Sequence, residues 1–133
     1  MKGRKAAVKS VAGALKKVPK PPGDLSPGAQ AVWRSELPAL VHAEKIAHHE
    51  LPLFKSYCSA TARIDEAQAE IDKHGLLIMS ASGELKRNPA TTIQKEAIAL
   101  QARLATEFGI SPASRGKNER FIDDEDAPPG VAL

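Results

Sequence analysis

The sequence predicts a mainly α-helical fold with three main helices, a small β-hairpin, a disordered basic N-terminal arm and a disordered acidic C-terminal tail. Three observations predict this fold. Apolar residues recur at spacings of three and four in three separate segments, which is typical of amphipathic helices. Two short apolar runs flank a Gly-containing turn between the second and third segments, as in a hairpin. Finally, basic and acidic residues gather at opposite ends of the chain.

The composition limits the chain to one domain with a thin core. It has 133 residues, of which 42% are hydrophobic. However, 22 of these are Ala, and the aromatic residues are only one Trp, one Tyr and three Phe. Little apolar area is therefore available to offset the conformational entropy lost on folding. Small domains of this kind commonly obtain further stability from a partner, so we expect copies of the chain to associate.

Nothing in the sequence indicates secretion or membrane insertion. The single cysteine, Cys58, cannot form an intramolecular disulfide. No stretch approaches the ~20 apolar residues that span a bilayer, and Lys9, Lys16 and Lys17 interrupt any apolar segment near the N-terminus. The sequence predicts a soluble cytosolic protein with no membrane partner.

Charge divides the chain into three regions. We expect a basic disordered arm and Pro-rich linker in residues 1–23, a helical oligomerisation core in residues 24–116 and a disordered acidic tail in residues 117–133. Residues 1–20 carry seven Lys or Arg and no acid, a density that favours contact with nucleic-acid phosphates, although a solvated tail is the plain alternative. The candidate DNA contacts in this arm are Lys2, Arg4, Lys5, Lys9, Lys16, Lys17 and Lys20.

The arm also carries an apolar stripe, formed by Val8, Val11, Ala12, Leu15 and Val18. This spacing could form a short helix on contact with a partner. Pro19, Pro21 and Pro22 then prevent the helix from continuing and predict a stiff, extended linker.

The first helix is expected to begin at Ser26-Pro27, because Ser can cap free amides and Pro is preset for the first turn. We expect Pro38 to kink or end it. Its predicted buried stripe consists of Ala29, Val32, Trp33 and Leu37.

The second helix is expected to be longer, from about His49 to His74, with Gly75 as its stop. Pro52 predicts that it begins late or with an irregular first turn. Its predicted inner positions, spaced three and four apart, are Phe54, Tyr57, Cys58, Thr61, Ile64 and Ile71.

A hairpin is predicted next, with strands in residues 76–79 and 84–87 and Gly83 supplying a turn that needs positive φ. Lys86 and Arg87 at its edge are either a second phosphate contact or charge that discourages the strand edge from pairing. Asn88-Pro89 then caps a third helix, which Phe108-Gly109 ends. Its seam consists of Ala90, Ile93, Ala97, Leu100 and Leu104.

This seam is suited to packing on the second helix or on another subunit. A further short turn is expected from Ser111-Pro112 to about Arg115. The candidate oligomerisation residues on the second and third helices are Ile64, Ile71, Ile93, Ala97, Leu100 and Leu104.

The sequence offers no catalytic or metal-binding motif. The four histidines show no ligand spacing, and Cys58 lies on an apolar stripe without a basic neighbour in sequence. The acidic run in residues 123–126 has no scaffold that would fix two metal ions. No phosphate-binding loop of the GxxxxGK[ST] form occurs. We therefore expect no enzymatic activity, no metal and no cofactor.

Several motifs together resemble one family of phage terminase small subunits. They are Leu25-Ser26-Pro27, Trp33 in the first helix, Tyr57-Cys58 early in the second and the stop at Gly75. The likeness is strongest in residues 87–90, Arg-Asn-Pro-Ala, and 107–115, Glu-Phe-Gly-Ile-Ser-Pro-Ala-Ser-Arg. The likeness spans roughly residues 22–115, and residues 48–52 depart from the usual pattern.

The resemblance implies a protein that binds viral double-stranded DNA at the packaging start, in the host cytoplasm. It also implies a homo-oligomeric ring that hands DNA to a large terminase subunit carrying the ATPase and nuclease. The acidic tail would dock that subunit through Asp123, Asp124, Glu125 and Asp126. Two alternatives stay open: a nucleoid-type nucleic-acid-binding protein, and a helical adaptor whose N-terminal stripe binds a membrane or a partner.

Overall fold

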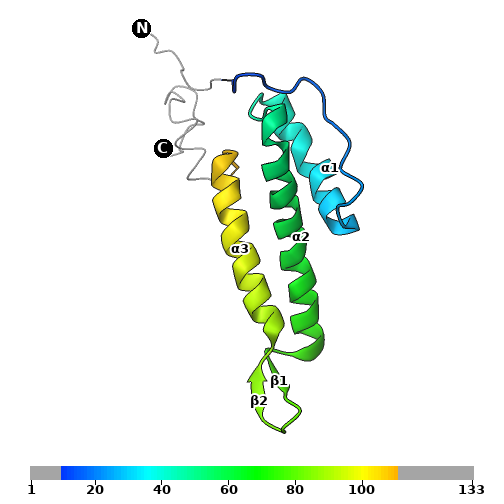
Figure 1. Ribbon diagram of the computed structural model, residues 1–133, viewed down its shortest axis with the longest axis vertical. Helices are drawn as coiled ribbons and strands as arrows, with labels where there is room; N and C mark the ends of the chain where they lie inside the picture. Colours follow the sequence, from blue (N-terminus) through cyan, green and yellow to red (C-terminus); the bar gives the residue numbers. More distant parts are fainter. Residues whose placement is uncertain (1–9, 111–133) are drawn as a thin grey trace, which may run out of the picture.

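The structure is a computed structural model that describes residues 10–110. Its elements are α1 (Pro27–His42), the 3-10 turn η1 (His48–Glu50), α2 (Leu51–His74), β1 (Leu77–Met79), β2 (Leu85–Arg87) and α3 (Pro89–Glu107). The molecule is elongated: α2 and α3 run antiparallel along its length, α1 covers one end of this pair, and the hairpin projects from the other end (Figure 1). The predicted class, mainly helical with three helices and a small hairpin, is confirmed.

Helix α1 begins where the sequence places it. The Ser26 hydroxyl accepts a hydrogen bond from the backbone N–H of Ala29 at 3.1 Å, and Pro27 occupies the first turn. The helix does not end at Pro38 but continues to His42. Pro38 and Arg34 both lie on the exposed side, so the carbonyl that loses its N–H partner is turned to water.

Helix α2 begins with an irregular first turn, as Pro52 predicts. The 3-10 turn η1 precedes it, and Pro52 occupies its first turn. The helix ends at Gly75, whose φ of 91° lies in the region that favours glycine. The predicted end at residues 74–75 is confirmed.

The two strands pair antiparallel, with Leu77 opposite Arg87 and Met79 opposite Leu85. Gly83 in the turn has a φ of 89°, as predicted. Asn88 then joins three parts of the chain. Its side-chain oxygen caps α3 at the Ala90 N–H, 2.9 Å away, while its side-chain amide donates to the Gly75 carbonyl at 2.8 Å.

The molecule has two regions of different packing. We call the end covered by α1 the head. Its core holds the rings of Trp33, Phe54, Tyr57 and Phe108, with Phe54 at the centre: 5.4 Å from Trp33, 5.6 Å from Tyr57 and 5.7 Å from Phe108. We call residues 63–98 the stalk, which consists of the far halves of α2 and α3 and the hairpin. Its buried cluster is only Ala67, Ile71 and Ala90.

Candidate nucleic-acid interface

The described part of the predicted basic arm, residues 10–22, lies against the head. An isolated bridge pairs Ala14 with Ala47, and the Leu15 N–H donates to the Ile46 carbonyl at 2.9 Å. Further along, the Trp33 indole N–H donates to the Pro19 carbonyl at 2.8 Å. The predicted extended linker is therefore held on the buried Trp of α1. Residues 11–18 are not helical here; they form a turn and a bridge instead.

Glu44 fixes the start of this segment. It follows α1 with a φ of 56°, an uncommon conformation for a residue other than glycine. Its carbonyl accepts from the Val11 N–H at 3.0 Å, and its carboxylate accepts from the Ser10 hydroxyl at 2.5 Å and lies 3.5 Å from the Lys16 Nζ. The Ser10 hydrogen bond, followed by the Lys16 charge, lowers the pKa of the Glu44 carboxyl. This loop therefore positions the first described lysine.

Three of the seven predicted arm residues are described: Lys16, Lys17 and Lys20 are exposed on the head. Residues 10–22 contain these three lysines and no acid. The remaining arm candidates lie outside the described residues; they are Lys2, Arg4, Lys5 and Lys9.

The structure places further side chains beside Lys20 that the sequence does not single out as DNA contacts. A hollow of about 470 Å³ beside Trp33 is lined by Lys20 of the segment, His48 and His49 of η1, and Lys55 of α2. The sequence alone does not predict this neighbourhood, because only the fold brings residues 48 and 49 close to residue 20. In the sequence, the two adjacent histidines suggest only a metal site, which their spacing argues against.

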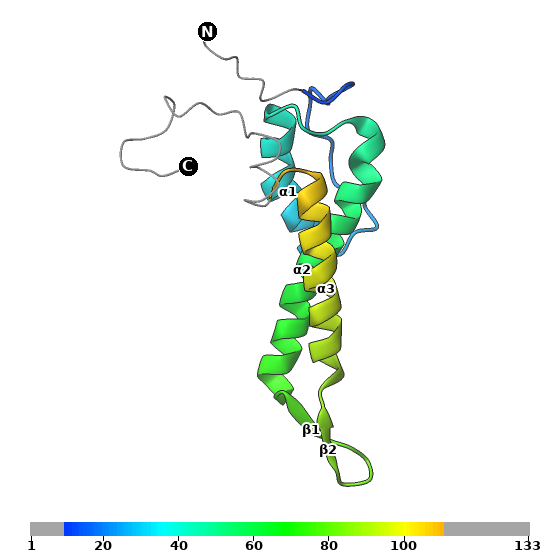
Figure 2. The same ribbon diagram turned by 90° about the vertical axis from the view of Figure 1, so that its left-hand side faces the viewer.

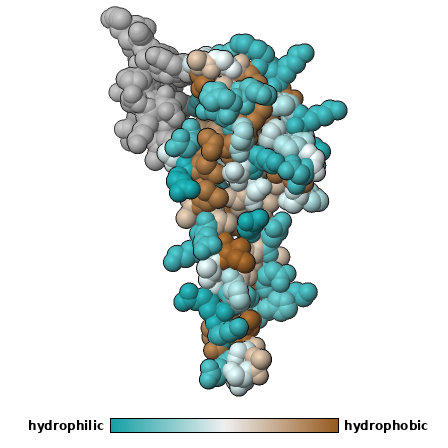
Figure 3. Space-filling model, viewed as in Figure 1, coloured by the Kyte–Doolittle hydropathy of each residue, from teal (hydrophilic) through white to brown (hydrophobic). Residues whose placement is uncertain are grey.

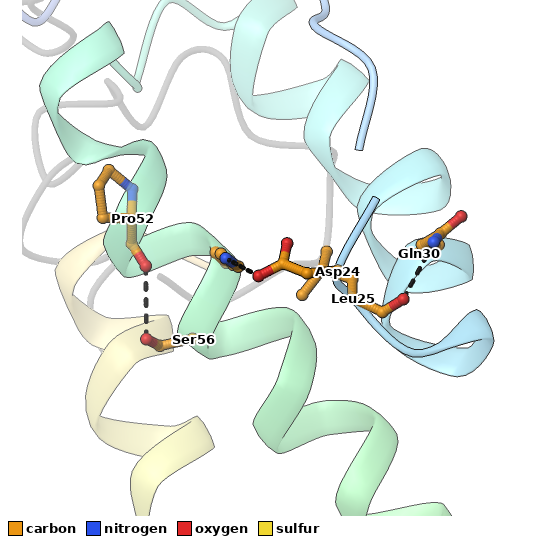
Figure 4. A network of polar contacts seen from close by, with 6 residues as sticks. Asp24, Leu25, Gln30, Pro52 and Ser56 are labelled. Atoms are coloured by element: carbon orange, nitrogen blue, oxygen red, sulfur yellow. Dashed lines mark hydrogen bonds and ion pairs between the residues drawn. The ribbon is translucent and has the colours of Figure 1, made fainter. Parts of the chain in front are cut away.

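One carboxylate faces this group. Lys55 Nζ lies 2.6 Å from Asp24 Oδ2, and this hydrogen bond lowers the pKa of the Asp24 carboxyl. In Figure 4 the Asp24 side chain extends from the stretch before α1 toward α2, next to the first turn marked by Pro52 and Ser56. Lys55 is thus partly neutralised, whereas Lys20 forms no ion pair with an acid within residues 10–110.

The other predicted DNA contacts lie at the far end of the molecule. Lys86 and Arg87 are exposed on β2, at the hairpin, and the two views together place the hairpin opposite the head (Figure 2). The fold therefore does not bring these two residues to the same surface as Lys16, Lys17 and Lys20.

The six predicted oligomerisation residues separate into two groups. Ile71, Ala97 and Leu104 are buried between α2 and α3 of the same chain, at 5–8% exposure. By contrast, Ile93 is 46% exposed, and Ile64 and Leu100 are half-buried.

A groove of about 720 Å³ between α2 and α3 contains part of this set. Ile93, Ala97 and Leu100 form one wall, and Ser59, Ala60 and the longer side chains of α2 form the other. Apolar surface is visible in patches along the length of the molecule and at its hairpin end (Figure 3).

The side chains with strongly shifted pKa belong to the head core. The Tyr57 hydroxyl donates to Glu36 Oε1 at 2.7 Å, and burial together with this bond raises the pKa of Tyr57 well above its usual value. Burial raises the pKa of the Cys58 thiol to about 12. A fully buried, protonated thiol is not a nucleophile at neutral pH, so Cys58 is a core residue.

Among residues 10–110, no group of three or more His, Cys, Asp or Glu side chains is arranged to hold a metal ion. Helices in the same part of the chain are too short or too polar to cross a membrane. The predicted docking residues of the large subunit, Asp123, Asp124, Glu125 and Asp126, and the turn after Ser111 lie outside the described residues.

Comparison with known families identifies one match. A family model described as "Phage terminase, small subunit" matches residues 29–124, which is most of the chain. Searches of curated proteins and of solved structures gave no match.

Proposed function

This chain belongs to the phage terminase small-subunit family, which points to a role in phage DNA packaging, and from this membership we propose how it acts. It binds viral double-stranded DNA at the packaging start, in the host cytoplasm, and associates with copies of itself into a ring. It then delivers the DNA to the large terminase subunit. It has no catalytic activity of its own, because the ATPase and nuclease of this system reside in the large subunit.

The observation that carries the DNA-binding proposal is the lysine segment held against the head. A lysine on a chain fixed by backbone bonds loses less conformational entropy on meeting a phosphate than one on a free chain. Three such lysines form a cationic surface, and His48 and His49 lie next to Lys20. Contacts of this kind recognise the phosphate backbone and do not distinguish one base sequence from another. The other arm candidates, Lys2, Arg4, Lys5 and Lys9, lie outside the described residues and belong to the same proposal by their charge.

Self-association is proposed through the groove between α2 and α3. Ile93 and Leu100 keep solvent-facing surface in this groove, which spans the boundary between head and stalk, and the proposed partner is the same groove region of a neighbouring copy. Ile71, Ala97 and Leu104 support this contact indirectly, by holding α2 against α3.

The large subunit is proposed to bind the acidic residues 123–126. This run begins 13 residues after Ile110, the last described residue, which packs on the head core. At roughly 3.3–3.6 Å per residue, the intervening chain can reach over ~40 Å.

The decisive experiment is DNA binding of the Lys16/Lys17/Lys20→Ala variant, measured by fluorescence anisotropy with a 30-base-pair duplex over a range of salt concentrations. Each lost phosphate contact removes about 0.9 from the slope of log K against log salt, so loss of three contacts lowers the slope by about 2.7. A control with the same charge change, Lys73/Lys95/Arg103→Ala, should keep the wild-type slope, because these exposed residues of α2 and α3 lie outside the proposed DNA-binding segment, residues 10–22. Equal slopes for both variants would refute residues 10–22 as the DNA-binding surface.

The same preparation distinguishes the adaptor alternative. Its amphipathic stripe is not helical in residues 11–18, and Leu15 packs against the head core rather than facing a partner. Co-sedimentation with anionic liposomes, in the absence of duplex binding, would favour the adaptor over the terminase role.

A further inference from the structure

The hairpin has the largest concentration of exposed apolar side chains in the described chain. Eight large apolar residues between residues 10 and 110 are exposed, and four of them lie within residues 76–85. Their exposed fractions are 64% for Leu76, 57% for Leu77, 63% for Met79 and 64% for Leu85. Such a cluster at the tip of a molecule is uncommon unless something covers it.

Three of these side chains share one face. Residues directly opposite each other in an antiparallel pair point to the same side, and so do residues two apart. The register pairs Met79 with Leu85 and Leu77 with Arg87, so Leu77, Met79 and Leu85 form one surface, with Arg87 at its corner. We call these three residues the apolar hairpin face. Ile78 and Lys86 lie on the opposite side.

The backbone of the same residues is directed outward. The Asn88 N–H donates to the Leu76 carbonyl at 2.8 Å, and the Ser80 N–H donates to the Glu84 carbonyl at 2.7 Å. Bonded and non-bonded pairs alternate in an antiparallel ladder, so the pairs that contain the apolar hairpin face are the non-bonded ones. Their N–H and C=O groups point away from the hairpin, to the outer edge of β1 on one side and of β2 on the other.

The apolar surface also continues toward the helices. A hollow of about 350 Å³ lies between the base of the hairpin and the first turns of α3. It is lined by Leu76, Leu77, Arg87, Thr91, Thr92 and Lys95. The apolar side chains of Leu76 and Leu77 therefore also border a hollow outside the two strands.

We propose that hairpins of neighbouring copies pair edge to edge, with β2 of one copy hydrogen-bonded to β1 of the next. This inference rests on the self-association proposed above and names a second surface for it. Copies related by rotation about an axis parallel to the stalk all have their hairpins at the same end and their β1 strands running in the same direction along that axis. Because β1 and β2 run in opposite directions, the strands brought together are then antiparallel throughout, and the apolar hairpin faces merge into one layer.

Pairing between copies satisfies the open edges of both β1 and β2, whereas a single foreign strand pairs with only one of them. A strand from another protein would complete one edge and leave the other open, whereas copies arranged around an axis complete both edges of every hairpin. Two strands alone are marginally stable in water, and exposed edges are usually protected. An acidic or phosphate ligand does not suit a face made of Leu and Met side chains.

The test is the assembly state of the full-length Met79/Leu85→Ser variant, measured by native mass spectrometry and sedimentation over a range of concentrations. We expect the concentration at which half of the chains assemble to rise at least tenfold. The matched control, Val18/Leu53→Ser, also replaces two exposed apolar residues (44% and 46%) but should assemble as the wild type does. Circular dichroism verifies that both variants are folded.

A second measurement does not depend on a variant. In the assembled wild type, the amides of Leu77, Met79, Leu85 and Arg87 should exchange hydrogen slowly, and dilution to monomers should restore fast exchange. Fast exchange in the assembly, or assembly of the serine variant at wild-type concentration, overturns the hairpin contact but leaves the groove and the DNA proposal intact. Protection that appears only when the large subunit is added overturns it as well. A wild type that stays monomeric refutes self-association altogether.

Discussion

The head and the stalk share the same two long helices but differ in what lies between them. In the head, α1 and residues 10–26 close over the helix pair, and four aromatic rings are buried. In the stalk, two helices face each other over Ala67, Ile71 and Ala90, while the hairpin leaves four large apolar side chains in water. Two helices alone cannot surround a core, so the apolar residues of the stalk stay at its surface. We therefore expect the head to be the more stable region of a single chain, and the stalk to be the region that the proposed self-association stabilises.

The largest test of this comparison is Phe54→Ala. Phe54 is fully buried and contacts three other rings, so we expect a loss of about 3–5 kcal/mol in the free energy of unfolding. Ile71→Ala in the stalk should cost about 2 kcal/mol, the low end of its class, because its buried cluster contains only two alanines besides it. Urea unfolding followed by circular dichroism measures both. If Ile71→Ala cost as much as Phe54→Ala, the stalk core would not be the weaker one.

A smaller loss, about 1–3 kcal/mol, is expected for Asn88→Ala. This buried side chain caps α3 and also donates to the Gly75 carbonyl, so its removal leaves polar groups at both helix ends without partners. Ser26→Ala removes a cap in the head and should cost about 1 kcal/mol. The same urea experiment compares them, and an Asn88 variant no less stable than the Ser26 variant would contradict the joining role.

The head core should also be visible in the pH dependence of stability. Burial raises the pKa of Cys58 from 9.0 to about 12, and the pKa of Tyr57 is raised as well. The unfolded chain therefore loses these protons first, and stability should fall as the pH rises above about 9. At pH 8, Cys58 should react with a thiol reagent only on unfolding. Rapid labelling of the native protein would show that the head opens easily.

The smallest effect is expected for Asp24→Asn. Its ion pair with Lys55 lies at the surface of the head, and exposed pairs contribute little to stability. The midpoint of urea unfolding should stay where it is, while DNA binding at low salt should tighten slightly because Lys55 loses its carboxylate partner. A shift of the midpoint beyond that of Ser26→Ala would show that this pair holds residues 22–26 in place.

The helix limits were predictable because they depend on neighbouring residues. Ser26-Pro27, Asn88-Pro89, Gly75 and Gly83 each provide a cap or a backbone conformation within a few positions of their own. The hairpin follows from the same local signals. The family resemblance depends on motifs of this kind as well, and the family match over residues 29–124 confirms it.

The arrangement of the candidate site was not predictable, because it depends on residues far apart in sequence. No periodic pattern in the sequence predicts the hydrogen bond between Trp33 and Pro19 or the bridge between Ala14 and Ala47. The apolar seam of a helix likewise does not show whether the helix that packs against it belongs to the same chain or to another copy. The positions on the third helix include buried Ala97 and exposed Ile93, since α2 covers only part of that face. Where the arm ends, and which residues bind DNA, stay predictions.

The connectivity of the helices also sets the order in which the protein forms. Consecutive helices pack on each other, α1 on α2 and α2 on α3, and β1 pairs with β2, so residues 10–110 contain no crossover connection. On the ribosome, residues 10–22 emerge first but must wait for Trp33 and for residues 44–47 before they can dock. The hairpin is made before α3, yet its base is fixed only when α3 packs against α2. The hairpin surface proposed to join copies therefore takes its final form together with the head, whose core includes Leu104 and Phe108.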